Sequence, residues 1–215
     1  MICREGKFVF VHIYKTAGTS IQAGLSAKYS SLSKTGFWVL AHKFLRNSFL
    51  TKHVRRHHLQ KHAGVSEYKI FLGDNWNDYF KFSFVRNPYD WQVSIYEYIR
   101  SSPGHSLNYF CNKVSFREYL LSEVVESMRT QSSFLMSGQS LLVDYVGHFE
   151  TLEDDWNCLS DILSIPLGVS LPKLNKSKRL DIRHYYDSLS LEIVRSRFKD
   201  DFVNFGYPQE LQCSD

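Results

Sequence analysis

The sequence is poor in cysteine and has no long apolar run. Its four cysteines (Cys3, Cys111, Cys158 and Cys213) are scattered without CxxC spacing, which argues against a disulfide framework or a cysteine-type zinc site. No run of 18 apolar residues is present, so we expect no membrane-spanning helix. The first residues lack the basic and long apolar regions of a signal peptide. These absences predict a soluble, cytoplasmic protein with free thiols.

Internal repeats, low-complexity linkers and the GxxxxGK[ST] loop of Walker A proteins are also missing from the sequence. The 215 residues are 43% hydrophobic and 22% charged, which is ordinary for one globular domain spanning 1–215. The net charge of +4 favours anionic partners only mildly. Apolar runs of strand length alternate with segments of helical spacing. We therefore predict an α/β domain with a mainly parallel central sheet flanked by helices.

The most informative stretch is a buried strand followed by a small, hydroxylated loop. Residues 8–14 are nearly all apolar, β-branched or aromatic, and Ile21 onward resumes at helical spacing. A strand, a tight loop and a helix N-terminus together direct backbone N–H groups and a positive dipole end at an anion. The loop offers one lysine, one glycine and three hydroxyls, from Lys15, Thr16, Ala17, Gly18, Thr19 and Ser20. The sequence predicts a P-loop-like phosphate-binding loop, and a plain turn is the alternative.

A second strand-to-helix junction carries an arginine. Residues 79–85 (YFKFSFV) predict a strand, and Pro88 is suited to the first turn of the helix that follows. Arg86 lies at the end of this strand, and Ser94 lies about two turns into the helix. A guanidinium and a hydroxyl placed there would suit a phosphate. The alternative is an ion pair of Arg86 with Asp90 or with Glu97, which leaves Ser94 on the helix surface.

Other segments predict further elements. The spacing of apolar residues over 44–62 predicts a basic helix with four histidines, in which no three converge and no carboxylate completes a metal site, so we predict no metal. Residues 68–78 are ambiguous. Residues 36–41 and 141–149 predict strands, and 116–128 and 185–205 predict helices. We expect Ser115 with Glu118, and Thr151 with Asp154, to cap the helices that begin beside them.

Taken together, the two junctions resemble the cofactor-binding segments of the PAPS-dependent sulfotransferases. The likeness is to the carbohydrate-type branch, sulfotransferase family 2, whose first segment commonly reads HIPKTGGTS or HIPKTAGTS; here residues 12–20 read HIYKTAGTS. FSFVRNPYD with Ser94 resembles the second segment. Gln131-Ser132 and the stretch 143–152, where His148 stands at a position commonly occupied by arginine, extend the resemblance over nearly the whole chain.

The resemblance implies a sulfotransferase that moves a sulfuryl group from PAPS, leaving PAP, to a hydroxyl or amine of a saccharide or small molecule. The loop Lys15–Ser20 would hold the 5′-phosphosulfate. Arg86 and Ser94 would hold the 3′-phosphate, with a further contact from the basic loop that contains Lys176 and Ser177. No nucleic-acid partner is expected.

Sulfuryl transfer, like phosphoryl transfer, depends mainly on positioning and charge stabilisation. Lys15 would neutralise charge on the bridging oxygen, and a histidine would deprotonate the acceptor. We choose His42, which follows the predicted strand 36–41, and Lys43 could share its role. His12 is second, because a histidine inside a buried strand is more often a core residue. His105, in a loop, is third.

Two rival functions make different demands. A kinase on a related fold would need Mg²⁺ held by an acidic residue at a strand end, for which Asp74 or Asp144 would serve. A polyanion-binding module would use the basic helix and would lose affinity steeply with salt. The first rival predicts metal-dependent activity, and the second predicts indifference to free nucleotide.

Overall fold

A computed structural model describes residues 1–29, 62–166, 171 and 180–211, which form two compact units. The first unit contains Met1–Phe84 and Phe134–Leu174. The second contains Val85–Ser133 and Asn175–Asp215. Each unit is described by itself below. Within the described ranges, no helix combines the length and the apolar character needed to cross a lipid bilayer.

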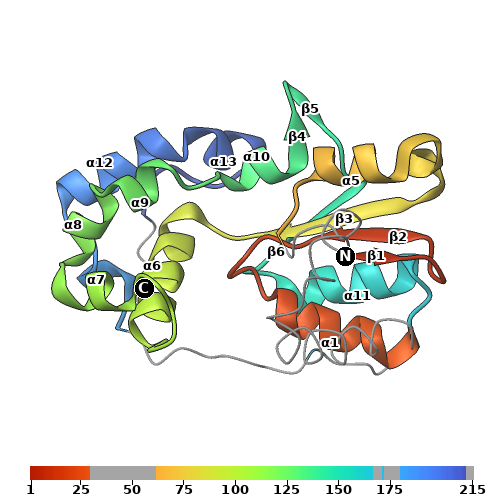
Figure 1. Ribbon diagram of the computed structural model, residues 1–215, viewed down its shortest axis with the longest axis horizontal. Helices are drawn as coiled ribbons and strands as arrows, with labels where there is room; N and C mark the ends of the chain where they lie inside the picture. The colour runs from red at the N-terminus through yellow and green to blue at the C-terminus, as the bar shows by residue number, and fades with distance from the viewer. Residues whose placement is uncertain (30–61, 167–170, 172–179, 212–215) are drawn as a thin grey trace, which may run out of the picture. The chain divides into compact units, whose positions relative to one another are not determined.

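The first unit is built on a four-stranded sheet (Figure 1). Its order is β1-β2-β3-β6, with β1 antiparallel to β2 and β2 parallel to β3. Phe8 pairs with Phe80 and Val11 with Ser83, so the carboxyl ends of β2 and β3 lie at the same edge. The four strands are β1 (Ile2–Cys3), β2 (Phe8–Val11), β3 (Phe80–Val85, which ends one residue into the second unit) and β6 (Tyr145–His148).

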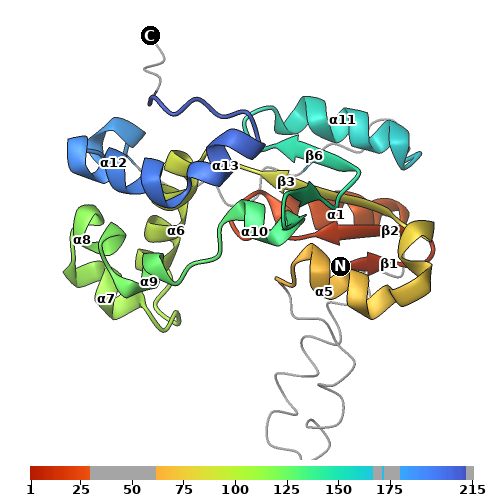
Figure 2. The same ribbon diagram turned by 90° about the horizontal axis from the view of Figure 1, so that it is seen from above.

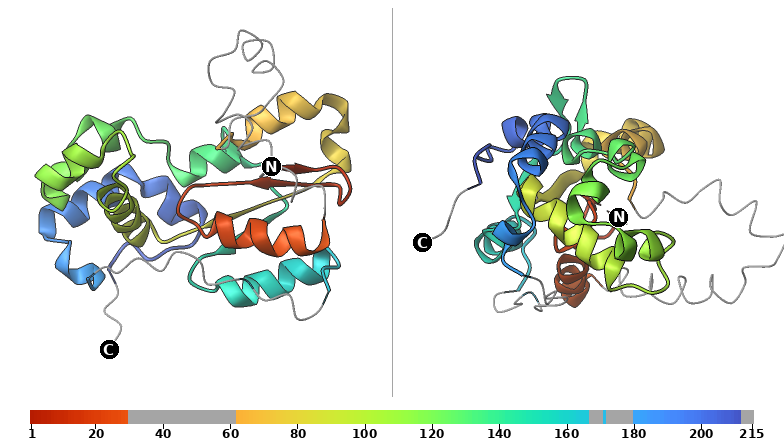
Figure 3. Two further views of the ribbon diagram at one scale, coloured as in Figure 1. Left: turned by 60° about the horizontal axis from the view of Figure 1, so that its bottom comes forward. Right: turned by 90° about the vertical axis from the view of Figure 1, so that its left-hand side faces the viewer.

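Helices cover both faces of this sheet (Figures 1 and 3). Helices α1 (Gly18–Lys28) and α11 (Leu152–Ile162) lie side by side against one face, and α5 (Val65–Leu72) lies over the other. The core between the sheet and the helix pair is aromatic and aliphatic, as the apolar runs require. Its most deeply buried members are Phe8, Phe10, Ile21, Leu25, Phe82, Phe84 and Leu159. The remaining elements of this unit are η2 (Gly73–Asp78) and the hairpin β4 (Met136–Ser137) and β5 (Ser140–Leu141).

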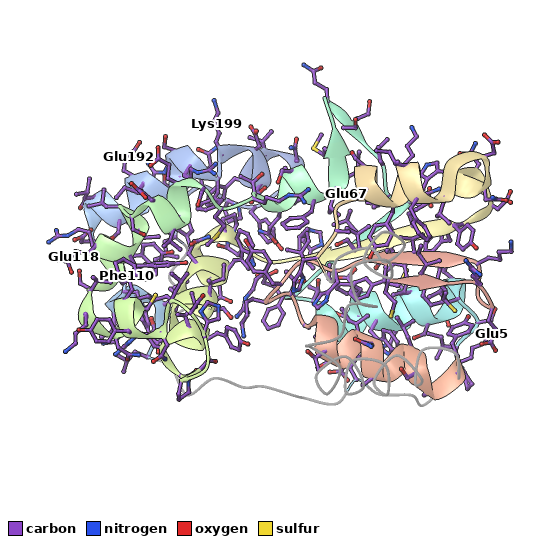
Figure 4. The ribbon with its side chains drawn as sticks, in the orientation of Figure 1. Glu5, Glu67, Phe110, Glu118, Glu192 and Lys199 are labelled. Atoms are coloured by element: carbon purple, nitrogen blue, oxygen red, sulfur yellow. The ribbon has the colours of Figure 1, made fainter. Side chains whose placement is uncertain are left out.

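The second unit is helical, and its longest helix is α6 (Pro88–Arg100), which is buried along most of its length (Figure 2). Aromatic side chains pack around it: the ring of Trp91 meets Phe198 edge-on at 5.8 Å, and Tyr96 meets Phe116 at 5.3 Å. Charged residues such as Glu118, Glu192 and Lys199 point outward (Figure 4). The other elements are α7 (Asn108–Lys113), α8 (Phe116–Leu120), α9 (Glu123–Glu126), α10 (Gln131–Leu135, whose last two residues fall in the first unit), η3 (Ile182–His184), α12 (Ser188–Arg197) and α13 (Lys199–Asn204).

These elements confirm the α/β prediction, a mainly parallel central sheet flanked by helices. The strands at 8–14 and 79–85 and the helix after Pro88 form where they were predicted, although β2 ends at Val11. The ambiguous stretch 68–78 belongs to α5 and η2. The predicted strand 141–149 is interrupted, because only its residues 145–148 join the central sheet.

The predictions of two long helices and of two helix caps are partly wrong. Ser115 and Glu118 form the expected capping box. Thr151 does precede α11, but its hydroxyl donates to the Asp155 carboxylate at 2.6 Å instead of capping the helix with Asp154. The stretch 116–128 forms two helices, α8 and α9, because the first ends at Leu120. Just beyond this end, the Ser122 hydroxyl donates to the Tyr119 carbonyl at 2.6 Å. Residues 185–205 form α12 and α13, which meet at residue 198.

Some predictions lie outside the described residues. These are the strand 36–41 and the basic helix that follows it, including His42 and Lys43, and the loop with Lys176 and Ser177.

Candidate functional site

The predicted phosphate loop lies between β2 and α1, at the edge of the sheet where the parallel strands β2 and β3 end. Lys15 and Ala17 both have left-handed backbones, with φ of 65° and 63°. A left-handed backbone conformation is uncommon for residues other than glycine and is unfavourable by about 1–2 kcal/mol per residue. The surrounding structure must therefore hold both residues in this conformation. Turns that mix left- and right-handed residues direct successive N–H groups into one concavity, where anions bind.

Hydrogen bonds on the inner side of the loop maintain this conformation. Thr16 is fully buried, and its hydroxyl donates to the Ile13 carbonyl at 2.8 Å. The N–H groups of Ser20 and Ile21 both donate to the Ala17 carbonyl, at 2.9 and 3.1 Å, which closes the first turn of α1. The Thr16 hydroxyl therefore shapes the loop, while Thr19 is exposed and Lys15 is half-buried.

The loop is packed against a histidine. His12 lies just after β2, so the expectation that it sits inside the strand is wrong, and its half-buried ring stacks on Phe10 at 5.5 Å. A Cβ atom added to Gly18 would lie 1.9 Å from the His12 Nε2 atom. His62 contacts the same residue, with its Nδ1 atom 3.0 Å from the His12 carbonyl oxygen and ring centroids 4.8 Å apart. Gly18 is thus required by close approach of an imidazole.

The second junction brings Arg86 and Ser94 together within the helical unit. The Arg86 Nη1 group donates to the Ser94 hydroxyl at 3.0 Å, and the two side chains are 6% and 5% exposed. The alternative ion pair is present as well: Nε and Nη2 of Arg86 both lie 2.5 Å from Oδ2 of Asp90. Glu97 pairs with Arg100 instead. The carboxylate and the hydroxyl together fix the plane of the guanidinium.

The backbone of Arg86 is held by a residue whose role the sequence analysis did not identify. The Gln131 side chain accepts a hydrogen bond from the Arg86 N–H at 2.9 Å and donates to the Arg86 carbonyl at 2.7 Å. Gln131 is fully buried, as is Asp201, whose carboxylate accepts from the N–H groups of Gln131 and Ser132. Gln131-Ser132 was noted only as part of the family resemblance, and no local pattern links it to position 86.

The remaining candidates are placed as follows. The loop 15–20 belongs to the sheet unit, and Arg86 with Ser94 belongs to the helical unit. His105 accepts a hydrogen bond from the Leu107 N–H at its Nδ1 atom, 3.1 Å away, and its ring meets Tyr98 edge-on. Among the described residues, no group of three or more histidine, cysteine or acidic side chains is arranged to hold a metal ion.

The acidic residues considered for a kinase lie elsewhere. Asp144 directly precedes β6, and its N–H donates to the carbonyl of Lys81, near the start of β3. Its carboxylate accepts from the Lys81 N–H at 2.7 Å and pairs with the Lys81 ammonium at 2.8 Å. Asp74 lies in η2. Asp144 is therefore near the strand starts, at the opposite edge of the sheet from the phosphate loop.

The chain matches a protein-family model over most of its length. The model of the sulfotransferase family (Sulfotransfer_2) matches residues 1–208, which includes both units and both junctions. No curated protein and no solved structure gave a significant match. Because the match covers nearly the entire chain, the protein belongs to the sulfotransferase family.

Proposed function

We propose that this protein transfers a sulfuryl group from PAPS to a hydroxyl or amine of a saccharide or small-molecule acceptor. The observation that carries the proposal is the loop after β2, where left-handed residues at positions 15 and 17 open the first turn of α1. Amide groups and a helix N-terminus arranged in this way suit the tetrahedral oxygens of a phosphosulfate. Family membership supports sulfotransferase chemistry in general. The choice of PAPS as donor is supported by the resemblance of the loop and of the Arg86 segment to the cofactor-binding segments of this family.

In the proposed reaction the loop acts on the 5′ end of the donor. The backbone N–H groups of Thr16 to Thr19 and the Thr19 and Ser20 hydroxyls would hold the non-bridging oxygens, while the Ser20 N–H donates to the Ala17 carbonyl. Lys15 would stabilise the negative charge that develops on the bridging oxygen as the S–O bond breaks. A general base, for which His42 remains the proposed residue, would accept the proton of the acceptor as the new S–O or S–N bond forms.

The 3′-phosphate is assigned to the second junction. Arg86 is 6% exposed, and Asp90 and Ser94 hold its guanidinium in a defined orientation. Lys176 and Ser177 are proposed as additional contacts. A phosphate recognised in this way would distinguish PAPS from nucleotides that lack a 3′-phosphate.

The observations favour this function over a magnesium-dependent kinase. A kinase would use a carboxylate near the transferred phosphoryl group to hold the metal. The Asp144 carboxylate is instead occupied by Lys81 near the strand starts. Within the loop 15–20 itself, the one charged residue is the cationic Lys15.

The first experiment is calorimetric titration of the wild-type protein with PAP, with and without Mg²⁺, and of the variant Arg86→Ala. We expect binding that does not depend on Mg²⁺. Removing the charge-assisted hydrogen bonds of Arg86 should weaken PAP by roughly 30-fold, which corresponds to about 2 kcal/mol.

The matched control is Arg117→Ala. Arg117 is an exposed arginine of the same helical unit that pairs with Asp187 at 2.9 Å. Its removal should leave PAP affinity unchanged. Absence of PAP binding to the wild type, or binding only with Mg²⁺, would reject the proposal and favour the kinase.

A further inference from the structure

The backbone of Arg86 is clamped by one buried side-chain amide. Oε1 of Gln131 accepts from the Arg86 N–H at 2.9 Å, and Nε2 donates to the Arg86 carbonyl at 2.7 Å. Two reciprocal hydrogen bonds to one residue fix the backbone on both sides of its Cα atom. They therefore set the direction in which the Arg86 side chain leaves the backbone, immediately after β3 ends at Val85.

The amide is in turn held by a buried carboxylate. Asp201, fully buried in α13, accepts from the Gln131 N–H at 2.9 Å and from the Ser132 N–H at 2.7 Å. Asn204 of the same helix donates to the Ser132 hydroxyl at 3.2 Å. Burial raises the pKa of Asp201, while the two backbone hydrogen bonds act in the opposite direction. A fully buried carboxylate is costly unless it is well paired, so the presence of Asp201 beside the five-residue helix α10 needs a reason.

We infer that the reason is the position of the Arg86 guanidinium, which these contacts control. A guanidinium is several ångströms from its Cα atom, so a small rotation of the backbone displaces it by about 1 Å, enough to weaken a bidentate contact strongly. Asp90 and Ser94 hold the tip of the side chain, and Gln131 holds its base. Arg86 is thus held at both ends by buried or partly buried polar groups, all within the helical unit.

We propose that Gln131, held in place by Asp201, is a positioning residue that aims the Arg86 guanidinium and thereby gives the protein its preference for nucleotides with a 3′-phosphate. The inference rests on the proposed function, in which Arg86 binds that phosphate. Gln131 itself contacts no nucleotide in this account, because both ends of its amide are engaged by the Arg86 backbone.

The test compares two nucleotides that differ only at the 3′ position. Dissociation constants for PAP and for 5′-AMP are measured by calorimetry on the wild type, Gln131→Met, Gln92→Met and Arg86→Ala. Methionine preserves the length of glutamine and removes both hydrogen bonds. We expect Gln131→Met to weaken PAP by roughly tenfold and to leave 5′-AMP unchanged, so that the ratio of the two constants falls by the same factor.

Gln92→Met is the matched control. Gln92 is equally buried in the same unit, but its amide contacts Tyr119 and Met128. This variant should preserve the nucleotide preference even if it lowers the melting temperature. A general loss of stability cannot therefore imitate the expected result.

The outcomes separate the inference from the function on which it rests. If Arg86→Ala does not reduce the preference for PAP, the 3′-phosphate assignment is wrong and the inference falls with it. If Arg86→Ala reduces it and Gln131→Met leaves it intact, or weakens both nucleotides equally, the positioning role alone is overturned. Should Gln131→Met fail to fold, Asp201→Asn decides: it should lower the same ratio roughly threefold, and an unchanged ratio would overturn the inference.

Discussion

At the scale of single residues, the contact between His12 and Gly18 explains why the phosphate loop needs glycine at that position. The φ of Gly18 is helical and available to any residue, so conformational freedom is not the reason. The imidazole of His12 occupies the space that a side chain would need. Because Gly18 also begins α1, its backbone lies where the loop becomes helix, and any displacement there is transmitted to the amides of the loop.

We therefore expect Gly18→Ala to disturb the loop. Its Cβ atom, 1.9 Å from Nε2, must displace the ring or the helix start, which typically costs about 1–3 kcal/mol. Urea denaturation and PAP titration should both show the loss. Gly104→Ala is the control, because a Cβ atom there meets nothing within 4 Å.

A double variant tests the cause of this loss. If the clash with His12 is responsible, His12→Ala combined with Gly18→Ala should be less destabilised than the sum of the single variants. Additive effects would contradict the explanation.

The residue scale also shows what the sequence can reveal. Lys15, Gly18, Arg86 and Ser94 could be chosen because each lies in a local pattern of strand, turn and helix. Gln131 could not, because it reaches the Arg86 backbone from a distant part of the chain and nothing around it marks that partner. Local sequence patterns identify candidate ligand-binding side chains. They do not identify residues distant in the sequence that position those side chains through hydrogen bonds.

At the scale of elements, one carboxylate fastens β6 to α11. Asp155 lies in the first turn of α11 and accepts from the Tyr145 hydroxyl at 2.6 Å, from the His148 N–H at 3.0 Å and from the Thr151 hydroxyl at 2.6 Å. Partial burial alone would raise the pKa of Asp155, but these hydrogen bonds outweigh it and hold the pKa below its ordinary value. Burial, together with the hydrogen bond to Asp155, raises the pKa of Tyr145.

Asp155→Asn should therefore destabilise the protein in a pH-dependent way. At pH 7 we expect a loss of about 2 kcal/mol in the free energy of unfolding, measured with urea. A depressed folded pKa stabilises above the unfolded value of about 4, and this stabilisation disappears as pH falls through the folded pKa. The difference between wild type and variant should shrink below pH 4.

Asp154→Asn is the control for this experiment, because Asp154 is an exposed neighbour in the same first turn. A loss that is equal in the two variants, or that is independent of pH, would contradict the account. The sequence analysis identified this junction but assigned the partner of Thr151 one residue too early. Capping statistics favour Asp154, whereas the observed contact depends on where β6 brings Tyr145 and His148.

The elements that sequence patterns predict best are those built from a continuous run of mainly apolar residues. Strands β2 and β3 consist mainly of apolar residues, and both were predicted. The long helices predicted over 116–128 and 185–205 are broken because tertiary contacts override helical spacing. Arg197, for example, donates to the carbonyls of Glu126 and Met128, which holds the end of α12 against the segment after α9.

At the scale of the whole molecule, the chain passes between the two units at three points, so each unit contains segments from distant parts of the sequence. β3 and α10 each have residues in both units. Each unit is therefore made of two chain segments that are separated in the sequence by a segment of the other unit. The single domain predicted over residues 1–215 stays a prediction. Calorimetry of thermal unfolding can test it.

We expect one cooperative unfolding transition, with calorimetric and van't Hoff enthalpies in agreement. PAP at 100 times its dissociation constant should stabilise the protein by about 2.7 kcal/mol and raise this melting temperature by roughly 5–10 °C. Two separate transitions, of which PAP shifts only one, would show two independent domains.

The parallel pairing of β2 with β3 has a consequence for synthesis on the ribosome. Phe8 pairs with Phe80, so the apolar strand β2 is synthesised well before β3, the strand with which it pairs in parallel. Closing so long a loop is slow, and unpaired apolar strands are prone to aggregate in the meantime. Production of this protein should therefore benefit from slower translation, lower temperature or added chaperones more than its ordinary composition suggests.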